Sequence, residues 1–400
     1  MNIIYLIISL LLYFFAPAKY NLLFCNAVTI LFLAQTIPFV IKKSRGNYVN
    51  FYALFFLSFF FINFFYPSFL YPVDPEFFPV FTLPFNEDYI NKGTALAQLS
   101  ISSFILGIQY LKTKQMNVSV KKPPSFISHI TTTKISTLIF ILFLISVGKE
   151  FLSGNFMAHS ILSLYNMILL TCSFNLSAII FFRNFQLQKQ RWLFYLSAGG
   201  YVLLFLIIGD RGPALSLLII IAGLYTFYVK KIALKYLLIF GFAGWVLMFL
   251  IGAGRTAYSG AEGNAIKRGI LRVQTENEVQ SFYQITEDFV VNTRNLYVGM
   301  EVVEESGVNW GTTSLFVSIL SIFPFAQSIF EYSTGVELQT SSVFFTELAF
   351  GKNPSYGLGT NLVADVYISF GLIGVIGLFM LFGRTVELYR KKTITKNDIY

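Results

Sequence analysis

The apolar residues of this chain are gathered into long blocks, and no other feature of the sequence constrains the fold as much. A helix needs roughly 20 consecutive apolar residues to cross a hydrocarbon core of about 30 Å. Only 12% of the residues are charged, about half the fraction of a typical soluble domain. The sequence therefore predicts an all-α polytopic membrane protein with about ten transmembrane helices. The predicted spans are 3–17, 22–41, 51–71, 94–111, 134–148, 161–182, 192–208, 213–229, 234–251 and 360–383.

The basic residues give these spans an orientation. Cytoplasmic loops carry an excess of Lys and Arg, and with a cytoplasmic N-terminus most of the 29 basic residues fall inside. Both termini are then cytoplasmic. The net charge of +9 reflects this topology, so no nucleic-acid partner is expected. The inside residues are Lys42, Lys43, Arg45, Lys112, Lys114, Lys121, Lys122, Lys134, Arg183, Lys189, Arg191, Lys230, Lys231, Lys235, Arg384, Arg390, Lys391, Lys392 and Lys396.

The start of the chain has two interpretations. Residues 1–18 end in Ala16-Pro17-Ala18, which could serve as a signal-peptidase site. No Lys or Arg precedes the apolar run, so an uncleaved first span is favoured. Cleavage would leave the other spans unchanged.

One long external connection divides the predicted bundle. Residues 1–251 hold nine spans, 252–359 form the large loop, and 360–400 contain the last span and a cytoplasmic tail. Apolar residues at gaps of three or four predict an amphipathic helix from about 265 to 305. Residues 313–330 are also apolar, but a crossing there would place the basic tail outside. A re-entrant or interfacial helix is therefore predicted for that stretch.

Arginines gather on the predicted non-cytoplasmic side, where basic residues are scarce. They are Arg211, Arg255, Arg268, Arg272 and Arg294. The guanidinium group binds phosphate oxygens in a bidentate manner. A cluster of this kind beside the bilayer points to a phosphorylated, lipid-linked substrate.

Four of these arginines also have a plainer interpretation. The stretch 209–213 (GDRGP) could be a tight turn between two helices, in which Asp210 and Arg211 are simply solvated. A helix N-terminus favours anions, however, and Arg211 lies next to one. Arg268 and Arg272 project from one helix face beside Lys267 and could instead bind lipid headgroups. Arg294 is the weakest member, with an ordinary surface position as the alternative.

Several carboxylates are candidates for a general base. Asp365 is unusual among them because it lies inside the last span, where acidic residues are costly. The chain lacks nucleotide-binding and metal-ligand motifs, so neither a metal nor another cofactor is expected. Gly371, Gly374 and Gly377 predict a face where two helices approach closely. The candidate bases are Asp210, Glu276, Glu278, Glu287, Asp288 and Asp365.

Three motifs in this layout resemble a known family. GDRGP at 209–213 follows a span, and GLGTN at 357–361 precedes ADVYISFG at 364–371. Together with the large external loop, they resemble the bacterial O-antigen polymerases of the Wzy type. The resemblance implies a multi-pass protein of the bacterial inner membrane with a GT-C-like architecture and an active site facing the periplasm.

The resemblance also implies a reaction and its partners. Such a glycosyltransferase joins oligosaccharide repeat units that are linked to undecaprenyl pyrophosphate, in contact with membrane lipids and a chain-length regulator protein. Arg211 and Arg255 would bind the donor pyrophosphate, with Asp210 or Asp365 as the base. The acceptor or glycan would be held by Arg268, Arg272, Arg294 and Lys267. An O-antigen ligase, or a flippase with cationic residues inside the bundle, is the alternative.

Overall fold

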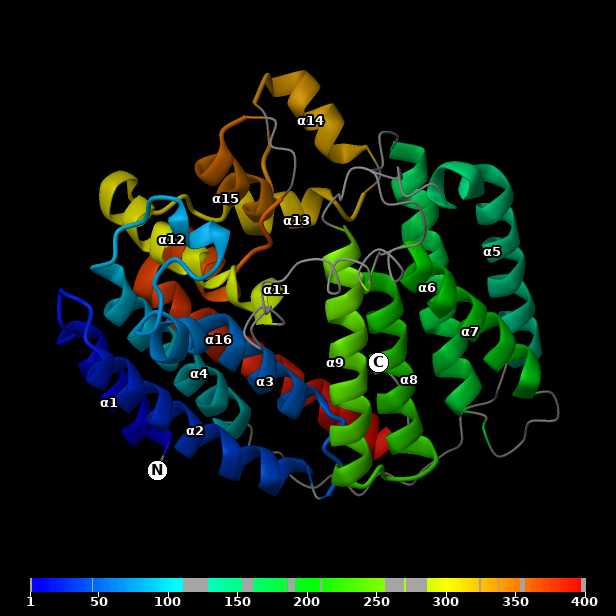
Figure 1. The fold of residues 1–400 in the computed structure, drawn as a ribbon, viewed down its shortest axis with the longest axis horizontal. Coiled ribbons are helices and arrows are strands. Elements are labelled where there is room, and N and C mark those ends of the chain that lie inside the picture. The colour runs from blue at the N-terminus through cyan, green and yellow to red at the C-terminus, as the bar shows by residue number, and fades with distance from the viewer. Residues whose placement is uncertain are drawn as a thin grey trace. The chain divides into compact units, whose positions relative to one another are not determined.

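The computed structural model of the chain is helical, and the residues that it describes include no strand (Figure 1). It describes all residues except 1, 45, 111–128, 153–160, 184, 186–190, 209–210, 256–269, 271–285, 324, 337, 353–356 and 397–400. The backbone alone is described at 110, 129, 147–152, 161–165, 248, 252–255, 288 and 393–396.

Among the described residues, six helices are long and apolar enough to cross a membrane. This confirms the predicted all-α class. The other four predicted spans coincide with helices that are shorter or more polar, at Asn2–Phe14, Phe51–Asn63, Tyr89–Tyr110 and His129–Leu152. The six are Leu22–Ser44, Asn166–Arg183, Arg191–Ile208, Arg211–Tyr228, Leu234–Ile251 and Leu362–Lys392.

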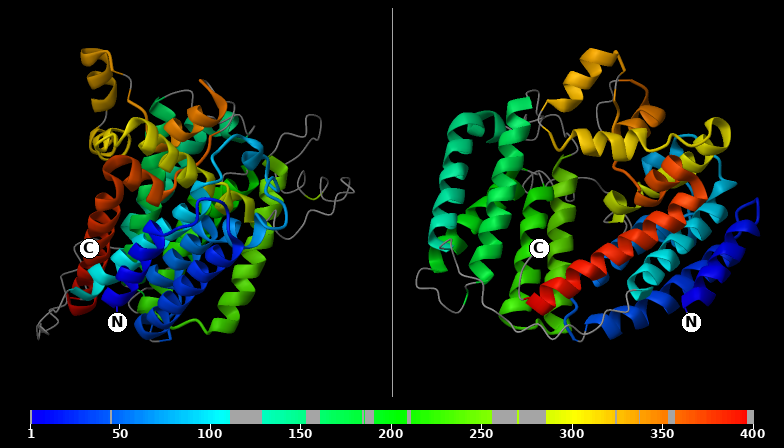
Figure 2. Two further views of the ribbon diagram at one scale, coloured as in Figure 1. Left: turned by 90° about the vertical axis from the view of Figure 1, so that its left-hand side faces the viewer. Right: turned by 180° about the vertical axis from the view of Figure 1, so that it is seen from behind.

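The first compact unit combines Met1–Lys42, Leu54–Lys121 and Thr286–Tyr400 (Figures 1 and 2). The last helix, α16, packs most extensively against α4, and α1 and α12 pack against α4 as well. The elements of this unit are α1 (Asn2–Phe14), α2 (Leu22–Ser44), most of α3 (Phe51–Asn63), η1 (Tyr66–Leu70), η2 (Pro79–Thr82), α4 (Tyr89–Tyr110), α11 (Glu287–Val290), α12 (Thr293–Ser306), η5 (Thr312–Phe316), α13 (Val317–Leu320), α14 (Ala326–Thr334), α15 (Ser341–Phe350) and α16 (Leu362–Lys396).

Helix α4 is buried along most of its length although it is rich in polar residues. Its Gln98 Nε2 donates to Gln35 Oε1 of α2 at 2.9 Å, and Ser102 Oγ donates to the same oxygen at 3.0 Å. Ser9 Oγ of α1 lies 2.9 Å from Ser102 Oγ. Buried polar groups are tolerated when they are hydrogen-bonded. These bonds explain how a helix of modest hydropathy occupies the centre of the unit.

Helices α4 and α16 approach closely at two glycines. A Cβ atom on Gly107 would lie 2.0 Å from the carbonyl oxygen of Met380, and one on Gly383 would lie 2.1 Å from that of Phe104. Both obstacles are backbone atoms, which cannot rotate away. Small residues at such positions let two helix backbones meet.

The predicted glycine face at 371, 374 and 377 is wrong. A Cβ on Gly377 would meet no neighbouring atom within 4 Å, and one on Gly374 would meet Phe370 of its own helix at 2.2 Å. Gly371 instead interrupts α16, with φ 62° and ψ −156°. Only glycine adopts this conformation readily, so the residue serves as a break.

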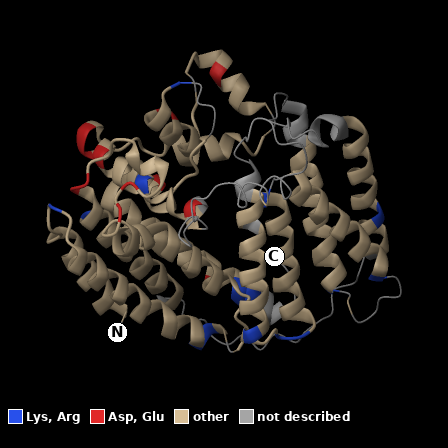
Figure 3. Ribbon diagram, viewed as in Figure 1, with Lys and Arg blue, Asp and Glu red and all other residues tan. Residues whose placement is uncertain are grey.

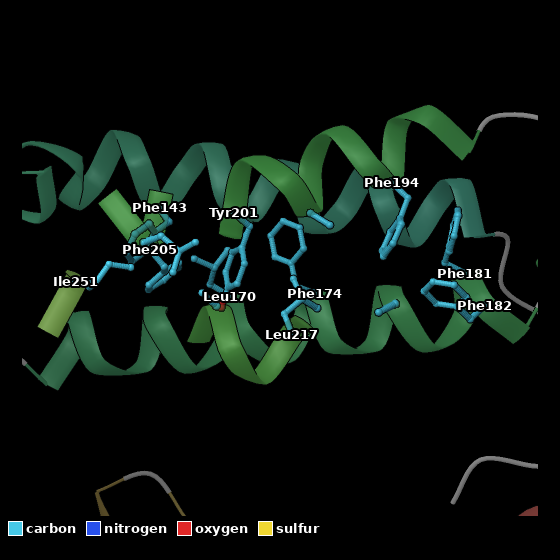
Figure 4. Packing of buried hydrophobic residues seen from close by; sticks show 14 residues of the cluster. Phe143, Leu170, Phe174, Phe181, Phe182, Phe194, Tyr201, Phe205, Leu217 and Ile251 are labelled. Atoms are coloured by element: carbon cyan, nitrogen blue, oxygen red, sulfur yellow. The ribbon is translucent and has the colours of Figure 1, made fainter. Parts of the chain in front are cut away.

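The second compact unit combines Lys43–Ala53 with Lys122–Ile285. Its core is aromatic (Figure 4): the rings of Phe181 and Phe194 stack with centroids 4.1 Å apart, and those of Phe174 and Tyr201 lie 4.5 Å apart. These contacts join α6 to α7. The helices of this unit are α5 (His129–Leu152), α6 (Ile161–Arg183), α7 (Arg191–Ile208), α8 (Arg211–Tyr228) and α9 (Leu234–Arg255).

The long connection contains short helices. The described end of the predicted 265–305 helix is α11 followed by α12, with a turn at 291–292 between them. Tertiary bonds hold this turn, since Asn361 Nδ2 donates to the Asn292 carbonyl and Thr293 Oγ1 donates to the Ile62 carbonyl. Residues 313–330 fall into η5, α13 and α14, so the prediction that they form no spanning helix is confirmed.

The glycine contact between α4 and α16 gives a stability prediction. Gly107→Ala and Gly383→Ala each force a methyl group against backbone, so we expect a loss of about 1–3 kcal/mol. Gly377→Ala is the matched control on α16, and it should be neutral or slightly stabilising because alanine favours helix. Thermal unfolding of the purified chain in detergent measures all three. Equal midpoints for Gly383→Ala and the control would contradict the contact.

Candidate functional site

Charge is segregated between the two ends of the helices in the first unit (Figure 3). The C-terminal part of α16 carries Arg384 and the sequence from Arg390 to Lys392. The opposite end, where α4 and α16 begin, carries mostly acidic residues. These include Asp74, Glu76, Glu87, Asp88, Glu301, Glu304 and Glu305. The segregation follows the predicted pattern of inside and outside loops.

The second unit shows a related pattern in the α8–α9 hairpin. Lys230, Lys231 and Lys235 lie at or beside the connection between the two helices. Arg211 is the first residue of α8 and is half-buried, and Arg255 is the last residue of α9. The two helices are joined by the short connection at residues 229–233, so Arg211 and Arg255 are the residues of α8 and α9 farthest in sequence from that connection.

Helix α8 begins two residues earlier than predicted. The sequence indicated Pro213 as its first residue, whereas the structure starts the helix at Arg211. Proline remains compatible at the third position because the first N–H groups of a helix have no partner within it. Arg211 therefore belongs to the first turn itself, where the positive end of the helix dipole lies.

Four predicted site residues lie outside the described residues. They are Asp210, Lys267, Arg268 and Arg272. For Arg255 the backbone alone is described. Their roles stay predictions.

Arg294 is buried, with 2% of its surface exposed, so the alternative of an ordinary surface residue is wrong. It lies in the first turn of α12, and its Nη2 donates to the carbonyl oxygen of Pro84 at 2.7 Å. Nearby, Tyr297 packs against Gly93 of α4. Burial raises the pKa of the Tyr297 hydroxyl well above its usual value, so this group stays protonated at neutral pH.

Asp365 is half-buried in the first turn of α16. Hydroxyl groups donate hydrogen bonds to both its side chain and its backbone carbonyl. Thr360 Oγ1 donates to Asp365 Oδ1 at 2.5 Å. Ser369 Oγ donates to the Asp365 carbonyl oxygen at 2.6 Å, and it lies 2.7 Å from Ser314 Oγ of η5. Asp365 thus has a fixed orientation where the long connection meets the last span.

The loop at residues 357–361 precedes α16 and is fixed by hydrogen bonds to residues of α3 and α12. Asn361 caps the helix, because its Oδ1 accepts from the N–H of Val363 at 2.9 Å, while its Nδ2 donates to Asn63 Oδ1 at 3.0 Å. Asn295 Nδ2 donates to the Gly359 carbonyl at 2.9 Å. A Cβ on Gly359 would lie 2.7 Å from Asn292 Oδ1, so a larger residue there would displace the Asn292 side chain.

Sequence reasoning missed the residues that position Asp365. Thr360 and Asn361 belong to the GLGTN motif, and no sequence pattern predicts the contact between Thr360 and the carboxylate. Asn63 and Asn361 are 298 positions apart in sequence, and Asn295 contacts a residue 64 positions away. Only the cap carried a local signal, since Asn directly precedes the apolar run of the last span.

The described arrangement offers two chemically distinct groups. In the second unit, Arg211 places a cation in the first turn of α8. In the first unit, Asp365 provides a carboxylate that accepts a hydroxyl hydrogen bond. The described residues contain no group of three His, Cys, Asp or Glu side chains that could hold a metal ion.

Comparisons of the chain with protein-family models, with curated proteins and with solved structures gave no match.

The burial of Arg294 gives a second prediction. Arg294→Ala removes a buried donor and leaves the Pro84 carbonyl without it, so we expect a loss of about 1–3 kcal/mol in folding stability. Lys352→Ala is the control, because Lys352 is an exposed cation of the same unit. The midpoints of thermal unfolding in detergent measure the stability of the two variants against that of the unsubstituted chain. An unchanged midpoint for Arg294→Ala would show that the guanidinium has no supporting role in the fold.

Proposed function

We propose that this protein polymerises oligosaccharide repeat units carried on undecaprenyl pyrophosphate, at the periplasmic face of a bacterial inner membrane. In this proposal all ten predicted segments cross the bilayer, both termini are cytoplasmic, and the architecture is GT-C-like. The product is O-antigen or a related surface polysaccharide. The partners are the two lipid-linked glycans, membrane lipids and a chain-length regulator protein.

The observation that carries the proposal is the position of Arg211. It begins α8, whose other end adjoins the lysine-rich connection to α9. A cation in the first turn adds to the positive end of the helix dipole, and this combination favours a bound anion. A second arginine, Arg255, is the last residue of α9, the other helix of the hairpin. A pyrophosphate at the membrane surface fits this charge.

The proposed reaction is a glycosyl transfer. A sugar hydroxyl of the acceptor attacks the anomeric carbon of the donor, forming the new C–O bond as the bond to the pyrophosphate oxygen breaks. The hydroxyl proton passes to a carboxylate, and the lipid pyrophosphate leaves with the bonding electron pair. Arg211 and Arg255 stabilise the negative charge that grows on this leaving group.

The carboxylate proposed to accept the proton is that of Asp365. Its oxygen already accepts a hydrogen bond from Thr360, so the group is oriented before substrate binds. Asp210 remains the alternative base, because it adjoins Arg211 in sequence. Arg268, Arg272 and Lys267 would hold the acceptor or guide the glycan.

The test of the overall function uses the surface polysaccharide of the bacterium that carries this chain. A strain lacking the chain should show single repeat units on the lipid core in place of the ladder of long chains. Complementation with Arg211→Ala should leave the ladder missing, whereas Lys230→Ala, at the other end of the same hairpin, should restore it. Membrane abundance of each variant is measured by immunoblot.

The pattern of loss separates the alternatives. Absence of every repeat unit from the lipid core would indicate a ligase or a flippase instead of a polymerase. A full ladder with Arg211→Ala at normal abundance would overturn the assignment of that arginine. A full ladder in the deletion strain would overturn the function.

The carboxylate has its own prediction. Asp365→Asn keeps the shape of the side chain but cannot accept a proton, so we expect polymer formation to fall by about 10²–10⁴-fold. Thr360→Val should reduce it less, because the carboxylate remains and loses only one oriented donor. Rates are measured with purified protein and lipid-linked repeat units. Full activity of Asp365→Asn would show that another carboxylate is the general base.

A further inference from the structure

Residues 308–323 form an apolar segment that leaves large side chains exposed. Every residue from Ser306 to Phe330 is uncharged. Trp310 is 76% exposed, and Ile319, Ile322 and Phe323 are exposed as well. Exposure of such a surface to water is unfavourable, because removing apolar area from water lowers the free energy. The segment therefore needs an apolar environment.

Contacts with α16 show where along that helix the segment lies. The N–H of Asn309 donates to the carbonyl oxygen of Ile368 at 2.9 Å, and Ser314 Oγ lies 2.7 Å from Ser369 Oγ. A Cβ on Gly311 would lie 3.1 Å from the ring of Phe370. The contacted residues are thus past the first turn of α16 and beyond its start at Leu362.

This position corresponds to a depth in the membrane. From Leu362 to Gly383 the only charged residue of α16 is Asp365, and Arg384 follows. At 1.5 Å per residue this apolar stretch is about 30 Å long, close to the thickness of a hydrocarbon core. Ile368 to Phe370 then lie roughly 10 Å along the helix from its start, inside the hydrocarbon.

The backbone of the segment meets the requirement of such a place. In hydrocarbon every backbone polar group needs a partner within the protein. The segment folds as η5 and α13, and Thr312 N–H and Phe316 N–H donate to the carbonyls of Asn309 and Gly311. Ser318 Oγ and Ser321 Oγ donate back to carbonyls one turn earlier. The Ile368 carbonyl, three residues before the break at Gly371, accepts from the Asn309 N–H.

We propose that residues 308–323 are a re-entrant segment, with Trp310, Ile319, Ile322 and Phe323 embedded in the acyl chains of the leaflet at the Leu362 end of α16. Lipid is the occupant because the segment contacts α16, an apolar helix on which Ile373 is 85% exposed. The segment has no charged residue, and its backbone forms hydrogen bonds within the protein. Both properties suit a hydrocarbon environment. This inference is independent of the proposed function.

Tryptophan fluorescence of the full chain tests this placement. The chain has three tryptophans, Trp192, Trp245 and Trp310. Replacing Trp192 and Trp245 by Phe leaves Trp310 as the single reporter. In phosphatidylcholine vesicles it should emit at shorter wavelength than tryptophan in water. Lipids brominated on their acyl chains should quench most of its emission, and aqueous iodide should quench little.

Two further single-tryptophan chains, both with Trp310→Phe, calibrate the quenchers. Ile373→Trp reports a lipid-facing position on α16 itself. Val73→Trp reports water, because Val73 is 72% exposed and precedes Asp74 in the acidic end of the unit. Trp310 should behave like Ile373→Trp. Quenching by iodide, as for Val73→Trp, would overturn the proposal, and so would protection from both quenchers, which would mean that protein covers the residue.

Discussion

The requirement that backbone polar groups in hydrocarbon be bonded within the protein governs this structure. It accounts for the helical form of the six apolar candidates and for the absence of strands among the described residues. It also limits where a spanning helix can break. In α16 the break at Gly371 is tolerated because the N–H of Asn309 takes the carbonyl of Ile368.

That single break connects several features of the first unit. Beside it the long connection packs against the last helix, and Ser314 meets Ser369 within one turn of Asp365. Asn361 then fixes the start of α16 through bonds to Asn63 and to the Asn292 carbonyl. The carboxylate at 365 is therefore held by elements from both ends of the chain. In the proposed reaction this orientation would favour Asp365 as the base, because the group would need little reorganisation.

Periodicity and charge predicted the class of the protein well. Each predicted span coincides with a helix, since long apolar blocks have few alternatives in a membrane. The glycines of α16 show where pattern reasoning failed. Spacing of three suggested a packing face, but a packing face depends on which neighbour lies opposite. That neighbour is α4, and it meets Gly383, with Gly107 as the matching residue.

The sequence by itself determined the helical class and the segregation of charge, because these follow from local hydropathy and residue chemistry. The tertiary structure decided that Arg294 is buried, that Asp365 accepts from Thr360, and that Asn63 and Asn361 meet. Side-chain contacts between residues hundreds of positions apart depend on how helices pack, and no local pattern encodes that packing.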